Sequence, residues 1–196
     1  MDATRLIIVA VGGQGNLLAS RVLGQAARLS DVPVRMSEIH GMAQRGGVVE
    51  SALVFGDAQS TIISDGEADI LLGFEPAEAL RALKKCSRET TVITNTAPLP
   101  PFTAAIGRGK YPAMEEIESL IRAKTKQLIT LDAAALAKQA GNMLSVNIVL
   151  LGALTAIGLL PVAAESVETA IRQITRPEYL ETNLKAFELG KSAAAG

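Results

Sequence analysis

The sequence has few of the residues that hold metals or stack on nucleobases. Its 196 residues include one cysteine, one histidine and no tryptophan. The single Cys86 excludes a disulfide within the chain, and it excludes an all-cysteine iron–sulfur cluster or a cysteine-rich zinc site held by this chain alone. With two tyrosines and four phenylalanines, few rings are available for stacking on bases or sugars. The lack of disulfides fits a reducing compartment, so we expect the protein in the cytoplasm.

Long apolar runs and an excess of one charge are also absent. The 19 basic and 20 acidic residues nearly cancel, so the chain lacks the electrostatic footprint that nucleic acid or an anionic membrane requires. The first apolar run, residues 6–11, is too short for a signal peptide. The longest one, residues 148–162, falls below the roughly 18 to 20 residues that a membrane span needs. We therefore expect no nucleic-acid partner, no membrane insertion and no export signal.

What the sequence does have is a regular alternation of apolar strands and amphipathic helices. Residues 5–11 form a continuous apolar run closed by glycines, which is typical of a central strand buried on both faces. Residues 17–29 follow with apolar side chains at helical spacing. Further strands are predicted at 32–39, 48–55, 69–74, 91–95, 102–106 and 128–131, and further helices at 76–88, 114–124, 133–140, 146–157, 163–174 and 178–189.

This pattern predicts an α/β fold. Alternating strands and helices favour a mostly parallel, open, Rossmann-like sheet with helices on both faces, followed by a helical C-terminal segment. No repeat, low-complexity linker or composition change divides the chain. Residues 1–196 are therefore predicted to form one domain, which fits a length near the upper end of the usual single-domain range.

The first candidate site is the turn between the first strand and the first helix, Gly12-Gly13-Gln14-Gly15-Asn16. Glycines let a ligand approach the backbone closely, and the start of a helix offers free N–H groups to an anion. A dinucleotide fingerprint would place glycine or alanine at position 18, where this chain has Leu18, although Glu38 stands where a ribose-binding acid would be. Three interpretations stay open: a phosphate site, a nicotinamide or flavin dinucleotide site, and a tight turn with nothing bound.

The second candidate is the loop of residues 37–47, the richest polar cluster in the chain. It contains the only histidine, His40, together with Gln44, Arg45 and Gly46. The planar guanidinium of Arg45 can clamp a carboxylate or phosphate, and His40 or Glu38 can move a proton. The alternative is that Arg45 and Glu38 form an ordinary ion pair while His40 caps the loop.

Other polar residues give weaker signals. The basic turn at 107–112 either contacts the phosphates of a ligand or is a solvated surface turn. Asn95 and Asn147 either orient a ligand or satisfy local backbone groups. Cys86, placed by the prediction on a helix among basic residues, is expected to be an inert thiol despite them. The apolar helix at 148–160 suits either an assembly interface or the core.

Several motifs are missing. The chain has no second histidine for a metal site, no G-x-S-x-G nucleophile motif and no P-loop. A thiamine diphosphate motif would read Gly-Asp-Gly, but Gly56-Asp57 is followed by Ala58. We therefore expect neither a metal site nor a resident cofactor in this chain alone.

Three segments carry a resemblance to a known family. In order and spacing, the chain resembles the gamma-type domain of the 2-oxoacid:ferredoxin oxidoreductases at V-G-G-Q-G-N-L-L-A-S-R-V-L-G (11–24), S-E-I-H-G-M-A-Q-R-G-G (37–47) and F-G-D (55–57). The histidine-containing loop most resembles the form in the small subunits that act on indolepyruvate, whereas pyruvate and oxoglutarate relatives share mainly its Arg-Gly end. Segments around Asn95, 107–112 and 147–154 also fit, so the resemblance spans nearly the whole chain.

The resemblance implies a subunit of an enzyme that converts an arylpyruvate, coenzyme A (CoA) and oxidised ferredoxin into an aryl-acetyl-CoA, carbon dioxide and reduced ferredoxin. It places thiamine diphosphate and 4Fe-4S clusters on a large partner subunit, which agrees with the missing motifs. This chain is then expected to be inactive alone. Alternatives are a gamma subunit for pyruvate, 2-oxoglutarate or ketoisovalerate, an NAD-dependent dehydrogenase, and a nucleotide-binding or scaffolding domain without an oxidoreductase partner.

Carried onto the matching positions, the resemblance implies one cleft for substrate and CoA. Arg45 is expected to pair with a substrate carboxylate or a CoA phosphate, and His40 is expected to line the same cleft. Backbone amides of the glycine turn are expected to face a phosphate or pantetheine group. The cofactor-binding set implied in this way is Gly12, Gly13, Gln14, Gly15, Asn16, Gln44 and Gly46.

Overall fold

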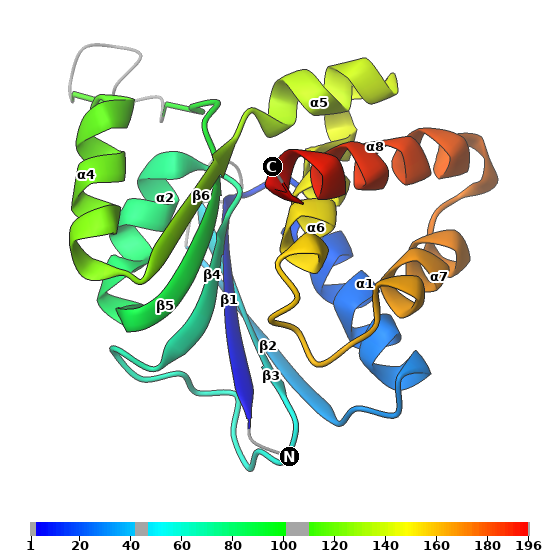
Figure 1. The fold of residues 1–196 in the computed structure, drawn as a ribbon, viewed down its shortest axis with the longest axis horizontal. Coiled ribbons are helices and arrows are strands. Elements are labelled where there is room, and N and C mark those ends of the chain that lie inside the picture. The colour runs from blue at the N-terminus through cyan, green and yellow to red at the C-terminus, as the bar shows by residue number, and fades with distance from the viewer. Residues whose placement is uncertain (1–2, 42–46, 101–109, 196) are drawn as a thin grey trace.

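The computed structural model describes residues 3–41, 47–100 and 110–195, which form a six-stranded sheet with helices on both sides (Figure 1). The strands lie in the order β2-β3-β1-β4-β5-β6. They are β1 (Thr4–Val11), β2 (Val34–His40), β3 (Val48–Phe55), β4 (Ala68–Gly73), β5 (Cys86–Asn95) and β6 (Gln127–Leu131). The helices are α1 (Asn16–Leu29), α2 (Pro76–Arg81), α4 (Met114–Lys124), α5 (Ala133–Ala140), α6 (Val146–Ala156), α7 (Ala164–Ile174) and α8 (Pro177–Ala195), with 3-10 turns η1 (Ala82–Lys85) and η2 (Met143–Ser145).

The sheet is mixed, with one reversed strand. β1 pairs with β4, β4 with β5 and β5 with β6 in parallel. β3 lies between β1 and β2 and is antiparallel to both. The predicted mostly parallel sheet with helices on both faces and a helical C-terminal segment is confirmed. The prediction did not include the reversed direction of β3. No helix separates β2 from β3, and two strands joined directly by a loop can pair antiparallel.

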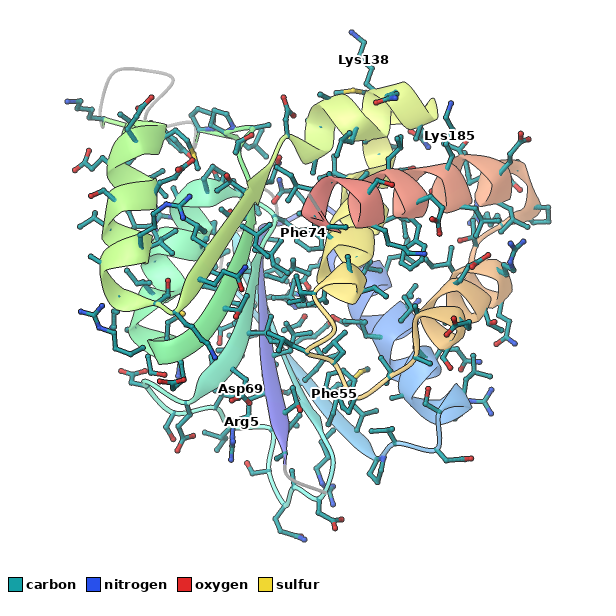
Figure 2. The ribbon with its side chains drawn as sticks, viewed as in Figure 1. Arg5, Phe55, Asp69, Phe74, Lys138 and Lys185 are labelled. Carbon is teal, nitrogen blue, oxygen red and sulfur yellow. The ribbon has the colours of Figure 1, made fainter. Side chains whose placement is uncertain are left out.

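Side chains alternate along the central strand and build a core on each face of the sheet. In β1, Leu6 and Ile8 face the layer of α1, α5, α6, α7 and α8, whereas Ile7 faces α2 and α4. All three side chains are fully buried, as expected for a strand covered on both faces. Phe55 and Phe74 belong to the first core and lie toward opposite ends of that layer (Figure 2).

The apolar stretch near residue 150 forms α6, a core helix. Every residue from Asn147 to Leu154 is buried within this chain, so the core interpretation holds rather than the assembly interface. α6 crosses α8 where both helices carry glycine: a Cβ on Gly152 would collide with the Phe187 carbonyl, and a Cβ on Gly190 with backbone of α6. The two missing side chains therefore set the distance between the helices. Within the described ranges no helix, α6 included, combines the length and apolar character needed to cross a membrane.

One predicted helix is wrong in its second half. The helix predicted at 76–88 ends at Arg81, a 3-10 turn follows, and Cys86 begins β5. β-branched residues from Thr90 onward favour a strand, and the Thr90 hydroxyl donates to the Ala68 carbonyl at 2.6 Å, which fastens β5 to β4. Cys86 is buried, and burial raises the pKa of its thiol to about 11, in agreement with the expected inert thiol. The strand predicted at 102–106 lies outside the described residues.

Replacing Gly152 by alanine should destabilise the protein. The added Cβ meets backbone, which cannot rotate away as a side chain does, so we expect the free energy of unfolding to fall by about 1–3 kcal/mol. Gly24→Ala is the matched control, because its Cβ meets only the flexible Met36 side chain and alanine favours a helix over glycine. Urea denaturation followed by circular dichroism measures both variants. An unchanged midpoint for Gly152→Ala would contradict the close crossing of α6 and α8.

Cys86 should be unreactive in the folded protein. Because its pKa is raised to about 11, little thiolate exists at neutral pH, and the buried position blocks reagents. Since the chain has one cysteine, a chromogenic thiol reagent should report one thiol per chain in urea and none in buffer. Rapid labelling of the native protein would show that the position of Cys86 in β5 is wrong.

Candidate functional site

The carboxyl ends of five strands meet at one edge of the sheet. β1, β2, β4, β5 and β6 run in the same direction, and the reversed β3 begins at that edge. From there α1 follows β1 onto one face, and α2 follows β4 onto the other (Figure 1). Open α/β sheets form their ligand crevice where neighbouring connections leave to opposite faces. The candidate site is therefore the edge between β1 and β4.

The glycine turn lies at this point. Gly13 and Gly15 have φ angles of 103° and 84°, a left-handed backbone that glycine adopts without strain. The side chain of Gln14 closes the turn, since its Oε1 accepts from the Val11 amide at 2.8 Å and its Nε2 donates to the Phe74 carbonyl at 3.4 Å. Gly15 is the N-cap of α1 and offers no capping side chain, so the first amides of α1 can face an anion.

Asn16 places a buried acceptor beside these amides. The residue is 4% exposed, and its Nδ2 donates to the Val49 carbonyl at 3.3 Å. Its Oδ1 is buried and has no hydrogen-bond partner among the described residues. Leaving a buried acceptor unpaired costs about 1–3 kcal/mol. A donor brought by a ligand or another chain would recover that free energy.

One end of the histidine loop bonds the glycine turn, and the two ends of the loop bond each other. The Gly12 amide donates to the Gly47 carbonyl at 2.8 Å, and the Gly41 amide donates to the Val48 carbonyl at 2.8 Å. The two candidate segments, apart in the sequence, are thus neighbours at the sheet edge. Three predicted site residues lie outside the described residues: Gln44, Arg45 and Gly46.

His40 and Glu38 lie on one face of β2, the face on which α1 packs, because side chains two apart in a strand point the same way. His40 Nε2 is 3.9 Å from Glu38 Oε2, and the Ser51 hydroxyl donates to the other carboxylate oxygen at 3.4 Å. The contact is an ion pair only when His40 is protonated. The His40 side chain is 60% exposed and therefore accessible to a ligand or partner.

The strand order separates Glu38 from the glycine turn. In dinucleotide-binding folds the strand that carries the ribose-binding acid lies next to the first strand. Here β3 lies between β1 and β2, which puts Glu38 about 10 Å to the side of β1 at a strand spacing of roughly 4.8 Å. Together with Leu18 in the fingerprint, this arrangement disfavours the dinucleotide interpretation.

Asn95 and Asn147 satisfy backbone groups. Asn95 Nδ2 donates to the Phe74 carbonyl at 3.2 Å and its Oδ1 accepts from the Ala133 amide at 3.1 Å, which joins the ends of β4 and β5 to the start of α5. Asn147 Nδ2 donates to the Gly15 carbonyl at 3.3 Å, which joins the start of α6 to the glycine turn. These contacts favour the interpretation that both amides satisfy backbone groups over the interpretation that they orient a ligand.

Sequence reasoning missed Glu75, a buried acid at the same edge. It is 1% exposed, and its carboxylate accepts from the Glu78 amide at 2.9 Å, the Leu99 amide at 3.1 Å and the Tyr111 hydroxyl. Burial and the bond to Glu75 raise the pKa of Tyr111, so its hydroxyl stays protonated and donates. An acid directly before Pro76 at the end of a strand is an N-cap signal that indicates the start of α2, although not its distant partners.

Glu78 is a second buried acid beside Glu75. Burial raises the pKa of Glu78, and the neighbouring Glu75 adds to the effect, against the opposing charge of Arg81. One Glu78 oxygen pairs with Arg81, and Oε2 has no partner within the described part of the chain. No three His, Cys, Asp or Glu side chains of the described ranges gather in a way that could hold a metal ion.

Comparison with known proteins relates this chain to one family. Residues 5–193 match the family model described as pyruvate ferredoxin/flavodoxin oxidoreductase. Indolepyruvate oxidoreductase subunit IorB of Methanothermobacter thermautotrophicus is 42% identical over 190 residues, 97% of each chain. The IorB subunit of Pyrococcus horikoshii is 40% identical over 99% of this chain and 97% of its own. 2-Oxoglutarate synthase subunit KorC of M. thermautotrophicus is 30% identical over 94% of this chain and 91% of its own.

A solved structure has the same fold. The gamma subunit of a keto/oxoacid ferredoxin oxidoreductase from Geobacter sulfurreducens matches with a TM-score of 0.71 at 23% identity, covering 97% of this chain and 98% of its own. The resemblance carried by the glycine turn and the histidine loop is therefore confirmed over nearly the full length. The chain belongs to the pyruvate ferredoxin/flavodoxin oxidoreductase family.

Proposed function

We propose that this chain is the small subunit of an indolepyruvate:ferredoxin oxidoreductase and forms the substrate and CoA side of an active site shared with a large subunit. The reaction is the CoA-dependent oxidative decarboxylation of an arylpyruvate to an aryl-acetyl-CoA, with ferredoxin as the electron acceptor. Two relatives named for indolepyruvate are 40% and 42% identical over almost the whole chain, against 30% for a 2-oxoglutarate relative. This difference favours an arylpyruvate over the other 2-oxoacids. A cytoplasmic location is part of the same proposal.

The observation that carries the proposed ligand site is the unsatisfied polar edge at the start of α1. CoA presents anionic phosphates and, along its pantetheine arm, amide N–H donors. The uncapped amides that follow Gly15 suit an anionic oxygen, and the buried Oδ1 of Asn16 suits an N–H donor. The turn therefore matches both kinds of group that CoA carries.

The histidine loop supplies the charged groups in this proposal. Arg45 pairs with the carboxylate of the 2-oxoacid or with a CoA phosphate, and Gln44 and Gly46 line the same cleft. His40, whose Nε2 lies 3.9 Å from Glu38, exchanges a proton with the bound acid or thiol. Support comes from the bond between Gly12 and Gly47, which holds the base of this loop against the glycine turn.

Thiamine diphosphate and the 4Fe-4S clusters belong to the partner subunit in this proposal. Cys86 is a single, buried thiol and offers no ligand set for a cluster. The described residues contain no gathered carboxylates for the divalent ion that a bound diphosphate requires. The part that this proposal gives to the chain itself is to bind and orient the acid and CoA.

Replacing Arg45 by alanine in the chain co-expressed with its large subunit should impair binding. A charge-assisted hydrogen bond to a carboxylate or phosphate is worth about 1.5–3 kcal/mol, so KM for the 2-oxoacid or for CoA should rise roughly 10- to 100-fold. Ferredoxin reduction with indolepyruvate, pyruvate and 2-oxoglutarate measures the effect and the substrate preference. Arg88→Ala is the control, because Arg88 is exposed at the opposite end of β5.

Wild-type KM values for both substrates in Arg45→Ala would refute the clamp. Nicotinamide-dependent activity of the purified chain by itself would favour a dehydrogenase instead. A pull-down of the tagged chain from its native cell extract that brings down no thiamine-dependent subunit would favour a stand-alone domain.

A further inference from the structure

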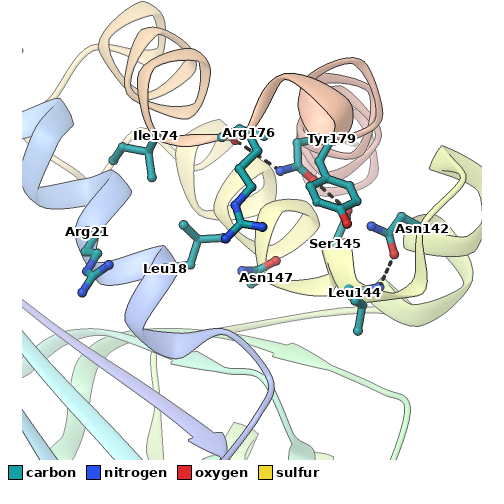
Figure 3. A pocket seen from close by; sticks show the side chains of 11 residues that line it. Leu18, Arg21, Asn142, Leu144, Ser145, Asn147, Ile174, Arg176 and Tyr179 are labelled. Atoms are coloured by element: carbon teal, nitrogen blue, oxygen red, sulfur yellow. Dashed lines mark hydrogen bonds between the residues drawn. The ribbon is translucent and has the colours of Figure 1, made fainter.

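A cavity of about 440 Å³ lies among the helices beside the glycine turn (Figure 3). Arg21 of α1 and Arg176, directly before α8, both line it. Asn147 also lines it and donates to the Gly15 carbonyl, so the cavity shares a wall with the turn. It therefore belongs to the site already described.

A separate pocket of about 290 Å³ lies at the opposite edge of the sheet, where β1 begins and β3 ends. We call it the amino-edge pocket. Arg5 of β1 and Val54 of β3 are paired neighbours in the sheet, and both line the pocket. Figure 2 shows Arg5 at this edge. Much of the remaining wall comes from residues 57–67, which connect β3 to β4. The volume is close to the lower end of the range of about 300–1,000 Å³ typical of ligand sites, so the pocket suits a small molecule.

The pocket contains part of the one resemblance segment that the proposed function leaves unused, F-G-D at 55–57. Phe55 is buried in the first core. Gly56, with φ of 94°, turns the chain out of β3, and its amide donates to the Pro33 carbonyl at 2.8 Å. Asp57 is exposed, lines the pocket and forms no ion pair with a basic side chain of the described ranges. Its carboxylate is therefore available to a ligand.

Charges of both signs line the pocket without contacting each other. Arg5 is half-buried, and within the part of the chain that the structure describes its guanidinium forms no ion pair. Glu67 lines the pocket as well, and its carboxylate accepts from the Ser64 amide at 2.9 Å. This hydrogen bond, aided by the charge of Arg5, lowers the pKa of Glu67. The pocket thus offers one cation and two carboxylates, counting Asp57, to a ligand that carries both charges.

The loop that forms the pocket is held in place by contacts of its own. Residues 56–67 contain neither helix nor strand, and connections of about this length without them are uncommon and often functional. Lys85 fastens the loop, because its Nζ donates to the Ile63 carbonyl at 2.7 Å and lies 3.4 Å from Asp65 Oδ1. The Gly66 amide donates to the backbone just before Lys85 at 3.1 Å. The pocket is therefore preformed, which lowers the entropic cost of binding.

We propose that the amino-edge pocket binds an α-amino acid, with its carboxylate on Arg5 and its ammonium group between Asp57 and Glu67. The side chain of the ligand lies against Val54 and Ile62, which is 79% exposed. A guanidinium and two carboxylates select a zwitterion over an acid without an amine and over an amine without an acid. An arylpyruvate is the 2-oxoacid that corresponds to an aromatic amino acid, so an aromatic ligand is favoured. That preference alone rests on the proposed function.

Calorimetric titration of the purified full chain tests this pocket. The probes are L-tryptophan, L-leucine, tryptamine, which lacks the carboxylate, and indole-3-propionate, which lacks the ammonium group. Each is titrated against the wild type, Arg5→Gln, Asp57→Asn and the control Glu89→Gln. Glu89 lies near the start of β5 at the same edge, its side chain is 85% exposed, and it does not line the pocket. Because Asp57 is exposed, Asp57→Asn should keep the fold, which circular dichroism checks for each variant.

L-Tryptophan should bind the wild type and Glu89→Gln equally, and either pocket variant at least tenfold more weakly. Its affinity should fall as salt is added, because the charges are partly exposed. Tryptamine and indole-3-propionate should bind at least tenfold more weakly than L-tryptophan.

No binding of either amino acid, or binding that survives both pocket substitutions, overturns the proposal. Tryptamine or indole-3-propionate binding as tightly as L-tryptophan overturns it too, because one charged group would then suffice. Equal binding of L-tryptophan and L-leucine supports the pocket but refutes the aromatic preference. The proposed function is tested separately by Arg45 in the complex, so either assignment can fail while the other holds.

Discussion

Gly15 has no side chain, and Asn147 occupies the space that one would need. The left-handed backbone at Gly15, with φ of 84°, turns the chain from β1 into α1, and Asn147 donates to the Gly15 carbonyl at 3.3 Å. Two helices from distant parts of the chain therefore begin side by side at the edge of the sheet. α6 is in turn held against α8 through the backbone contact at Gly152 and Gly190. The positions of the glycine turn, the cavity and the C-terminal helices all follow from these contacts.

The reversed strand brings the second candidate segment to the glycine turn. Because β3 runs antiparallel between β1 and β2, the loop that joins β2 to β3 has its ends at the carboxyl edge, where Gly12 bonds Gly47. A parallel strand in that place would need a crossover, and the loop ends would lie at opposite edges. Because β3 lies between β1 and β2, Glu38 on β2 also lies away from the position beside β1 where a ribose would bind. One topological change thus disfavours a dinucleotide site and brings the two candidate segments together at one edge of the sheet.

The parts of the fold that local signals determine were predictable. The helix predicted at 133–140 has its observed bounds because Asp132 caps its first turn at 2.8 Å from the Ala135 amide and Gly141, with φ of 113°, ends it. β3 likewise has the predicted bounds, but its place in the sheet depends on pairing with β1 and was not predictable from its own residues. β5 starts at Cys86 because of a tertiary bond from Thr90 to β4, which no helical pattern reveals.

The residues of the candidate site were likewise only partly predictable from the sequence. The glycine turn and the loop that begins at His40 were recognisable because each is a continuous motif. The buried carboxylate of Glu75 and the cavity between Arg21 and Arg176 consist of residues far apart in the chain, and only packing brings them together. Asn16 was recognisable as part of the turn, but its unpaired oxygen is a property of the packed structure.

In the proposed function, this chain completes an active site that its large partner subunit cannot form alone. The most direct measurement is CoA-dependent reduction of ferredoxin with indolepyruvate by the separately purified large subunit, before and after this chain is added. We expect negligible activity for either protein alone and a rate that rises to a plateau as the two reach equal amounts. A large subunit that reduces ferredoxin at its full rate alone, unchanged when this chain is added, would contradict it.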